Sequence, residues 1–205
     1  MKLRAILNAD LHFGIGKKNG LLFHLPKDMA FFKETTMGHT VCMGENTLLS
    51  FPHARPLKGR TNIVLSKDES HNYDGVINVH SMDDFKKEIQ KALEKDDVYI
   101  IGGASIYTQM LPYYDEVYLT RVEADGNAEV FFPNLDNNPN YKKEVPILPA
   151  YLSELHKLIL TTCLPCILSF FKVYLMSHKR SPAHENIFIS CKQILSGWRQ
   201  VDQGS

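Results

Sequence analysis

The chain has 205 residues, 44% of them hydrophobic and 22% charged, which suits one globular domain with a buried core and leaves room for a small second domain. Lys plus Arg and Asp plus Glu number 23 each, and this balance excludes a protein that binds nucleic acid or a membrane surface through bulk positive charge. The first ten residues do not resemble a signal peptide and four cysteines do not form a disulfide framework, so we expect a cytoplasmic protein.

The chain begins with an expected strand over residues 3–9, which leads into a loop over residues 10–25. Gly14, Gly16 and Gly20 of this loop come close to a dinucleotide-binding fingerprint, but the third glycine is one residue late and no helix begins there. We therefore expect these glycines to let the backbone pass close to a ligand, or to swing as a lid.

A helix is expected over residues 26–36, with Pro26 suited to its first turn. Asp28 lies three residues before Phe31 and four before Phe32, so a carboxylate shares one helix face with aromatic rings. A carboxylate on an apolar face is costly unless a ligand binds it or it takes up a proton, which makes Asp28 a candidate site residue. The alternative is an acid that merely suits the positive end of the helix.

Strands and helices alternate along the rest of the first 122 residues. This alternation is typical of an α/β fold with a mostly parallel central sheet and flanking helices. The expected strands are 40–43, 62–65, 76–79, 98–101 and 118–122, and the expected helices are 45–50, 82–95 and 105–111.

Two strand–glycine–helix junctions carry the candidate chemistry, Met43-Gly-Glu-Asn-Thr47 and Ile101-Gly-Gly-Ala-Ser105. Each brings the N–H groups and the positive dipole end of a helix to the carboxyl edge of a parallel sheet, where a phosphate or pyrophosphate binds well. A single glycine between a strand and a helix is common and often serves packing alone. Two of them, beside a glycine-rich loop and an acid-bearing helix, indicate a dinucleotide cofactor.

The sequence resembles the bacterial dihydrofolate reductases over residues 1–141. The resemblance rests on motifs that occur in order and with family-like spacings, namely Gly14-Ile-Gly16, Leu25-Pro-Lys-Asp28, Phe31-Phe-Lys33, Thr36, Met43-Gly44, Arg55-Pro-Leu-Lys-Gly-Arg60, Asn62, Ile101-Gly-Gly103, Tyr107, Tyr118-Leu-Thr120 and Phe132-Pro133. It implies a dihydrofolate reductase-like domain over residues 1–141, followed by a divergent segment of unknown structure over residues 142–205.

This resemblance implies an enzyme that passes a hydride from NADPH to C6 of 7,8-dihydrofolate while N5 takes a proton, which yields tetrahydrofolate. It implies that Asp28 binds the 2-amino group and N3 of the pterin, and that Thr120 shares this hydrogen-bond network. Arg60 is expected to hold the α-carboxylate of the glutamate tail, a bidentate role that suits a guanidinium group. The expected partners are dihydrofolate and antifolate inhibitors such as trimethoprim, and the expected state is a monomer.

The remaining site residues implied by the resemblance fall into a substrate half and a cofactor half. The residues expected at the pterin and benzoyl slot are Ile6, Leu7, Phe32 and Ile101. Those expected at the cofactor are Ile15, Gly16 and Leu21 in a lid over residues 15–22, Asn46, Thr47, Ser66, Lys67, Gly102, Gly103 and Ala104 near the phosphates and ribose, and Tyr107 near the nicotinamide. The site is expected to contain no metal.

The chain departs from the family at three places. Leu22-Phe23 stand where the family has Pro-Trp, so the indole N–H is lost. Glu45 follows Met43-Gly44 where the family has an arginine, so a basic residue at a phosphate-binding helix end has become an acid. After Tyr141 the sequence shows no sign of the two antiparallel strands that close the family's sheet.

The segment after Tyr141 carries three of the four cysteines. Its Cys163-Leu-Pro-Cys166 is typical either of a metal or redox pair or of two free thiols. The uncharged run Leu158–Phe171 is too short for a membrane span. Residues 170–175 offer one substitute strand.

Two alternatives to dihydrofolate reduction stay open on the sequence alone. The first is a reductase of the same fold that acts on another pterin or on a riboflavin precursor, and the joint presence of Asp28 and Arg60 argues against it. The second is a catalytically silent folate- or antifolate-binding protein, which Glu45 and the unusual C-terminal segment favour.

Overall fold

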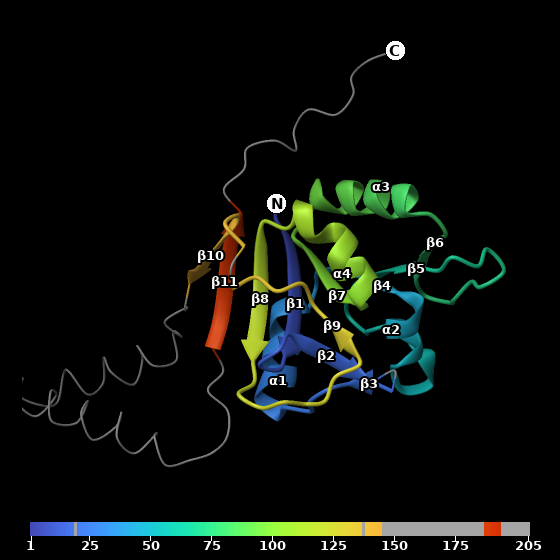
Figure 1. Cartoon of the computed structure of the whole chain (residues 1–205). Helices are drawn as coiled ribbons and strands as arrows, with labels where there is room; N and C mark the ends of the chain where they lie inside the picture. The colour runs from blue at the N-terminus through green and yellow to red at the C-terminus, as the bar shows by residue number, and fades with distance from the viewer. Residues whose placement is uncertain (19, 137, 145–186, 194–205) are drawn as a thin grey trace, which may run out of the picture.

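The computed structural model describes residues 1–18, 20–136, 138–144 and 187–193. Eight strands form one sheet in the order β10-β11-β8-β1-β7-β4-β5-β6 (Figure 1). The run from β8 to β6 is parallel throughout, which confirms the expected α/β fold with a mostly parallel central sheet. The strands of this sheet are β1 (Leu3–Ala9), β4 (Thr40–Gly44), β5 (Thr61–Leu65), β6 (Ile77–Val79), β7 (Val98–Gly102), β8 (Glu116–Arg121), β10 (Tyr141–Glu144) and β11 (Ile187–Gln193).

Helices pack against both faces of this sheet and give the chain two core clusters. Because neighbouring residues of a strand point to opposite faces, Ala5 of β1 belongs to one cluster with Phe85 and Ile6 belongs to the other with Leu48. Phe85 lies on the third helix and Leu48 on the second, so different helices close the two faces. The helices are α1 (Pro26–Thr36), α2 (Glu45–Leu49), α3 (Met82–Leu93) and α4 (Ala104–Met110), with 3₁₀ turns η1 (Pro52–Ala54) and η2 (Leu111–Tyr113).

Most of the expected elements are confirmed, and their bounds shift by at most a few residues. The first strand and the helix over 26–36 occur with the expected bounds. The loop expected over residues 10–25 is different, because it contains two short strands, β2 (Gly14–Lys17) and β3 (Gly20–Leu21). These form a second, antiparallel sheet with β9 (Val130–Phe131), which ties the loop to a distant part of the chain.

The closing strands that the sequence analysis failed to find are present as β10 and β11. β11 runs antiparallel to β8, with Ile189 opposite Leu119, and antiparallel to β10, with Cys191 opposite Lys143. Residues 145–186 separate the two strands in the sequence, so the second strand lies far beyond the place where the family pattern puts it. The two closing strands, which the sequence left in doubt, are therefore present.

Several features expected after Tyr141 lie outside the described residues, namely Cys163, Cys166, the run 158–171 and the substitute strand 170–175. Within the described ranges, no helix has the length and apolar character needed to cross a membrane. The same ranges hold no group of three His, Cys, Asp or Glu side chains placed to bind a metal ion.

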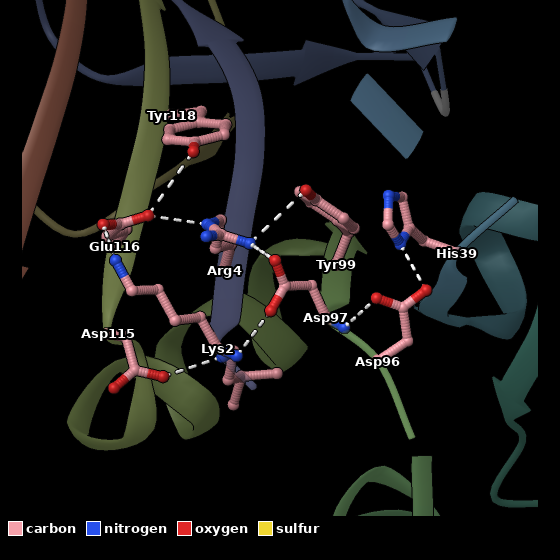
Figure 2. A network of polar contacts seen from close by, with 10 residues as sticks. Lys2, Arg4, His39, Asp96, Asp97, Tyr99, Asp115, Glu116 and Tyr118 are labelled. Atoms are coloured by element: carbon pink, nitrogen blue, oxygen red, sulfur yellow. Dashed lines mark hydrogen bonds and ion pairs between the residues drawn. The ribbon is translucent and has the colours of Figure 1, made fainter. Parts of the chain in front are cut away.

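The amino ends of three parallel strands are joined by a buried charge network (Figure 2). Arg4 of β1 donates from Nε to Oε2 of Glu116 at the start of β8, at 2.6 Å, and from a terminal nitrogen to Asp97 just before β7. Lys2 donates from Nζ to the other oxygen of Glu116 at 2.5 Å. Burial alone raises the pKa of Glu116, but the hydrogen bonds from Lys2 and Arg4 outweigh it and hold that pKa below its usual value.

Candidate active site

A cavity of about 1170 Å³ lies at the carboxyl ends of the parallel strands. The ends of β1, β4, β5 and β7 supply its floor, α1 supplies one wall, and the small sheet of β2, β3 and β9 supplies another. In open α/β sheets, ligands bind at this edge. Of the expected site residues, those that line the cavity are Ile6, Leu7, Ile15, Gly16, Leu21, Asp28, Phe32, Asn46, Thr47, Lys67, Ile101, Gly102, Gly103, Ala104 and Tyr107.

Asp28 is the buried acid of this cavity, with 8% of its surface exposed. Pro26 starts α1 without a side-chain cap, which puts Asp28 in the first turn, at the positive end of the helix. Thr120 of β8 donates from Oγ1 to Oδ1 of Asp28 at 2.6 Å. Asn8 of β1 donates from Nδ2 to Oδ2 at 2.8 Å. The structure therefore brings Asp28 and Thr120 together, although Thr120 itself does not line the cavity.

Asn8 is a site residue that the sequence analysis missed. It is 5% exposed, lines the cavity, and lies two residues after Ile6, on the same face of β1. The signal in the sequence was a polar amide near the end of a mostly apolar strand, on the face that Ile6 also uses.

Tyr107 of α4 lies beneath the cavity with its hydroxyl held by the backbone. The hydroxyl donates to the carbonyl oxygen of Ile6 at 2.9 Å, and the ring packs edge-on against Phe132 at a centroid distance of 5.2 Å. Burial, and secondly the charge of Asp28, raises the pKa of Tyr107 far above its usual range. Tyr107 is therefore a neutral group that fixes the position of β1 relative to α4.

The two glycine junctions meet at the cavity. Gly44 precedes α2, and Gly103 precedes α4 after a cis peptide bond from Gly102. Gly102 has φ of +133°, and a Cβ atom built there would lie 2.8 Å from Oγ1 of Thr47 in α2. Only glycine fits this approach, so the backbone of one junction packs against the side chain of the other. Their backbone N–H groups and hydroxyls suit a phosphate-bearing cofactor.

Glu45 lines the cavity at the start of α2 and is fixed by two neighbours. Tyr73 donates its hydroxyl to Oε1 at 2.5 Å, and His71 donates from Nδ1 to the same oxygen at 2.7 Å. The bond from Tyr73, with a smaller effect of His71, holds the pKa of Glu45 below its usual value, whereas burial opposes this. The same bond raises the pKa of Tyr73 to about 12. Glu45 is thus an ionised carboxylate near neutral pH.

Arg60 lies beside the cavity and does not line it. Its Nε donates to Oγ1 of Thr36 at 2.9 Å, and its guanidinium carbon lies 5.7 Å from the centre of the Phe32 ring, which does line the cavity. A terminal nitrogen donates to the carbonyl oxygen of Lys33 at 3.3 Å, near the C-terminus of α1, where the helix dipole favours a cation. Burial lowers the pKa of Arg60 from its usual value.

Ser66 is the third expected site residue that does not line the cavity. It is 2% exposed, and its hydroxyl exchanges hydrogen bonds with the backbone of Asp68, at 3.2 and 3.3 Å. Ser66 therefore shapes the loop after β5, while its neighbour Lys67 reaches the cavity.

The comparisons with known proteins agree on one family. A sequence model described as dihydrofolate reductase matches residues 2–145. The dihydrofolate reductase of Haemophilus influenzae is 37% identical over 136 residues, which are 66% of this chain and 81% of that protein. The dihydrofolate reductase of Bacillus subtilis is 36% identical over 137 residues, which are 67% of this chain and 78% of that protein.

A solved structure of dihydrofolate reductase from Enterococcus faecalis, complexed with NADP(H) and RAB-propyl, matches with a TM-score of 0.64 at 30% identity. The match covers 72% of this chain and 87% of that one. These findings decide for dihydrofolate reduction over a reductase of another substrate and over a silent binding protein. The chain belongs to the dihydrofolate reductase family and is an NADPH-dependent enzyme that reduces dihydrofolate.

Proposed function

We propose that the enzyme binds the pterin ring of dihydrofolate at Asp28, the glutamate tail at Arg60, and NADPH along the two glycine junctions. The observation that carries this proposal is the carboxylate of Asp28, which is buried at the cavity wall and fixed on both oxygens, by Thr120 and by Asn8. A carboxylate held in this way presents its remaining lone pairs in fixed directions, as recognition of a flat heterocycle requires.

Asp28 has an electrostatic role in the reaction. Its oxygens accept hydrogen bonds from the 2-amino group and N3 of the pterin, and its negative charge stabilises a ring that carries an added proton on N5. Thr120 orients the carboxylate by donating to Oδ1. Ile6, Leu7, Phe32 and Ile101 form apolar walls that hold the ring flat and keep water from it.

The cofactor half of the cavity would hold NADPH, because the protein has no group of its own that can supply a hydride. NADPH, when bound, provides the hydride that adds to C6 of the substrate. Asn46, Thr47, Lys67, Gly102, Gly103 and Ala104 would hold its phosphates and ribose, with Ser66 shaping the loop beside them, and Tyr107 would lie under the nicotinamide. The close approach of Gly102 to Thr47 supports this fit, because it brings together the two junctions, both of which line the cavity. Ile15, Gly16 and Leu21, in the small sheet, would cover the cofactor.

Arg60 is proposed to hold the α-carboxylate of the substrate. Its Nε is fixed by Thr36 and its guanidinium group lies near the ring of Phe32, so the side chain is ordered before the substrate arrives. The terminal nitrogens make longer bonds, at 3.3 and 3.5 Å, to the carbonyl oxygens of Lys33 and Lys58. A carboxylate offers these nitrogens a stronger, charge-assisted partner.

We also propose that the enzyme acts as a monomer in the cytoplasm, in keeping with the expectations from its sequence. In this proposal residues 1–141 form the dihydrofolate reductase-like domain with all of the proposed site residues. Residues 142–205 form a divergent segment that serves the fold through β10 and β11.

Replacing Asp28 by Asn tests the proposal, since it keeps the shape of the side chain and removes its charge. We expect turnover with dihydrofolate to fall by on the order of 10²-fold or more near neutral pH. The measurement is the dihydrofolate-dependent loss of NADPH absorbance. Glu34→Gln, an exposed change on the same helix, should leave this rate unchanged. Turnover of Asp28→Asn close to that of the unmodified enzyme would remove Asp28 from the mechanism.

A further inference from the structure

One part of the cavity wall is apolar and comes from α1 and from the segment that follows α2. Phe32 of α1, and Phe51 and Leu57 of that segment, line the cavity and pack against the same core cluster. Arg55 and Lys58 also line the cavity, and they flank Leu57 in the sequence. Both side chains belong to exposed residues. The apolar slot is therefore bordered by two solvated cations.

The backbone around Lys58 is held in place by a buried amide. Asn62 is 3% exposed, and its Oδ1 accepts a hydrogen bond from the backbone N–H of Leu57 at 3.0 Å. Its Nδ2 donates to the carbonyl oxygens of Leu57 and Arg60, at 2.9 and 3.0 Å. Lys58 lies inside this fixed stretch and Arg55 two residues before it, so the backbone that carries these cations is ordered without a ligand.

The two cations lie near Arg60, which is proposed to hold the α-carboxylate of the substrate. A terminal nitrogen of Arg60 lies 3.5 Å from the carbonyl oxygen of Lys58, so the guanidinium group is next to the backbone of that lysine. Within the part of the chain that the structure describes, neither Arg55, Lys58 nor Arg60 forms an ion pair with a carboxylate. Their positive charge is therefore available to an anionic ligand.

The substrate supplies the anion that reaches this part of the cavity. The phosphates of the cofactor are proposed to bind along the glycine junctions, whereas the glutamate tail is proposed to bind at Arg60. A tail that is lengthened through its γ-carboxyl group gains one carboxylate with each added residue. Arg55 and Lys58 lie close to Arg60 in the sequence and line the same cavity, so they suit the carboxylates that follow the first one.

We propose that Arg55 and Lys58 form a second carboxylate subsite, which binds the additional glutamates of a substrate with a γ-linked oligoglutamate tail. The proposal rests on the proposed binding of the α-carboxylate at Arg60. Each contact at this subsite is weak by itself, because ion pairs between exposed side chains stabilise little and are screened by salt. The subsite therefore acts through the number of carboxylates, and it favours longer tails.

The first test compares dihydrofolate that carries a single glutamate with dihydrofolate triglutamate, in the full-length protein. We expect the Kd of the triglutamate to be at least about fivefold lower at low ionic strength. At high ionic strength the two Kd values should approach each other, because mobile ions screen the exposed cations. Equal Kd values at low ionic strength would overturn the proposal.

The second test removes both cations in the double variant Arg55→Gln with Lys58→Gln. We expect the Kd of the triglutamate to rise at least about fivefold and that of the monoglutamate less than about twofold. The KM for the triglutamate should rise more than kcat falls, since the reaction takes place at the pterin ring. A double variant that keeps the preference for the triglutamate would overturn the proposal.

A matched control separates a local subsite from the charge of the whole molecule. Lys87→Gln with Lys95→Gln removes the same charge from exposed residues that do not line the cavity, and it should keep the preference for the triglutamate. If this control loses the preference as fully as the first double variant, the subsite is refuted. The Kd of NADPH should stay within about twofold in folded variants. If the double variant loses NADPH binding, the single variants Arg55→Gln and Lys58→Gln decide, and each should show part of the effect.

Failure of this proposal is distinguishable from failure of the proposed function. If Arg60→Gln leaves the KM for the monoglutamate unchanged, the α-carboxylate does not bind at Arg60 and both proposals for the tail fail. If Arg60→Gln raises that KM while the unmodified enzyme binds both substrates equally well, only the second subsite is refuted.

Discussion

At the scale of single residues, Glu45 is the point where the chain departs from the arginine that the family resemblance leads us to expect. A carboxylate at the start of a helix is favourable by roughly 0.3–1 kcal/mol, so the fold alone tolerates it. The polyphosphate of the cofactor is proposed to bind beside it, where like charges repel by about 1 kcal/mol or more. The hydrogen bonds from Tyr73 and His71 keep Glu45 ionised and fixed at the cavity wall. Once NADPH is bound, the repulsion between Glu45 and the phosphates should therefore exceed the stabilisation that Glu45 gains at the start of the helix.

We expect Glu45→Arg to tighten NADPH binding by at least about tenfold, or about 1.4 kcal/mol. The gain in NADPH affinity has two sources, the loss of repulsion between Glu45 and the phosphates and a new charge-assisted contact from the arginine. It should shrink at high salt, because mobile ions screen both interactions. Titration of NADPH into both proteins at low and high ionic strength measures it. Glu45→Gln removes the charge and keeps the acceptor oxygen for Tyr73, so it should give an intermediate gain. Dihydrofolate affinity should change little. Equal NADPH affinities would mean that the carboxylate does not face the phosphates.

Residue types at the site, and the pairing of Asp28 with Thr120 that the family resemblance implies, could be predicted from the sequence, but the other hydrogen-bond partners could not. Asp28 was found because an acid on an aromatic helix face is costly, and Gly102 because it belongs to a strand–glycine–helix junction that suits a phosphate. Asn8 was missed because its partner lies 20 residues away in the sequence, and only the packing of α1 on β1 brings the two together. Arg60 and Ser66 were expected at the site, but neither lines the cavity. Arg60 is bonded to Thr36 at the end of α1, and Ser66 is bonded to the backbone of Asp68 in the loop after β5.

At the scale of elements, long helices and buried strands were predictable and very short strands were not. The helix over 26–36 begins with a proline, and five of the seven residues in the strand over 3–9 are apolar. β3 and β9 have two residues each, which is too few for an alternating pattern to appear. They exist because β2 pairs with both, and that pairing is decided by the fold of the rest of the chain.

The charge network at the amino ends of β1 and β8 should give the protein a pH-dependent stability. The side chains of Arg4 and Glu116 are 10% and 8% exposed, so their ion pair is buried. Removing one partner of a buried pair leaves the other uncompensated and costs about 3–5 kcal/mol. We expect Glu116→Gln to lower the free energy of unfolding at pH 7 by about 3 kcal/mol, at the low end because Arg4 keeps Asp97 as a partner.

The sign of the pH dependence follows from the lowered pKa of Glu116. Its contribution is fully present above the usual carboxyl pKa of 4.5 and is lost as the pH falls through the lower pKa of the folded state. The stability difference between Glu116→Gln and the unmodified protein should therefore narrow below about pH 4.5. Denaturant unfolding at several pH values measures this difference. Glu34→Gln, at an exposed site on α1, should show no such trend, and a constant difference down to low pH would contradict the assignment.

At the scale of the whole molecule, the sheet is closed by a strand from far along the chain. β11 covers the outer edge of β8, the strand that carries Thr120 and Glu116 at its two ends. The run Ile187-Phe-Ile189 consists of strand-forming residues, but the role of β11 could not be predicted locally, because it depends on pairing with β8, which lies more than sixty residues earlier. The connection between the site and the C-terminal segment is therefore indirect and passes through the backbone of β8.

Removing β11 should destabilise the fold, and activity should be lost only as a consequence of unfolding. A chain that ends at residue 141 leaves the edge of β8 without a partner, and an exposed edge strand invites association with other chains. We expect this shortened chain to aggregate or to unfold, as measured by light scattering and circular dichroism. A chain that ends at Gln193 keeps β11 and should stay folded and active. The full chain should show a higher melting temperature with trimethoprim, because a ligand of the folded state stabilises it by mass action. If the chain that ends at residue 141 stays folded and active, then β8 does not need β11.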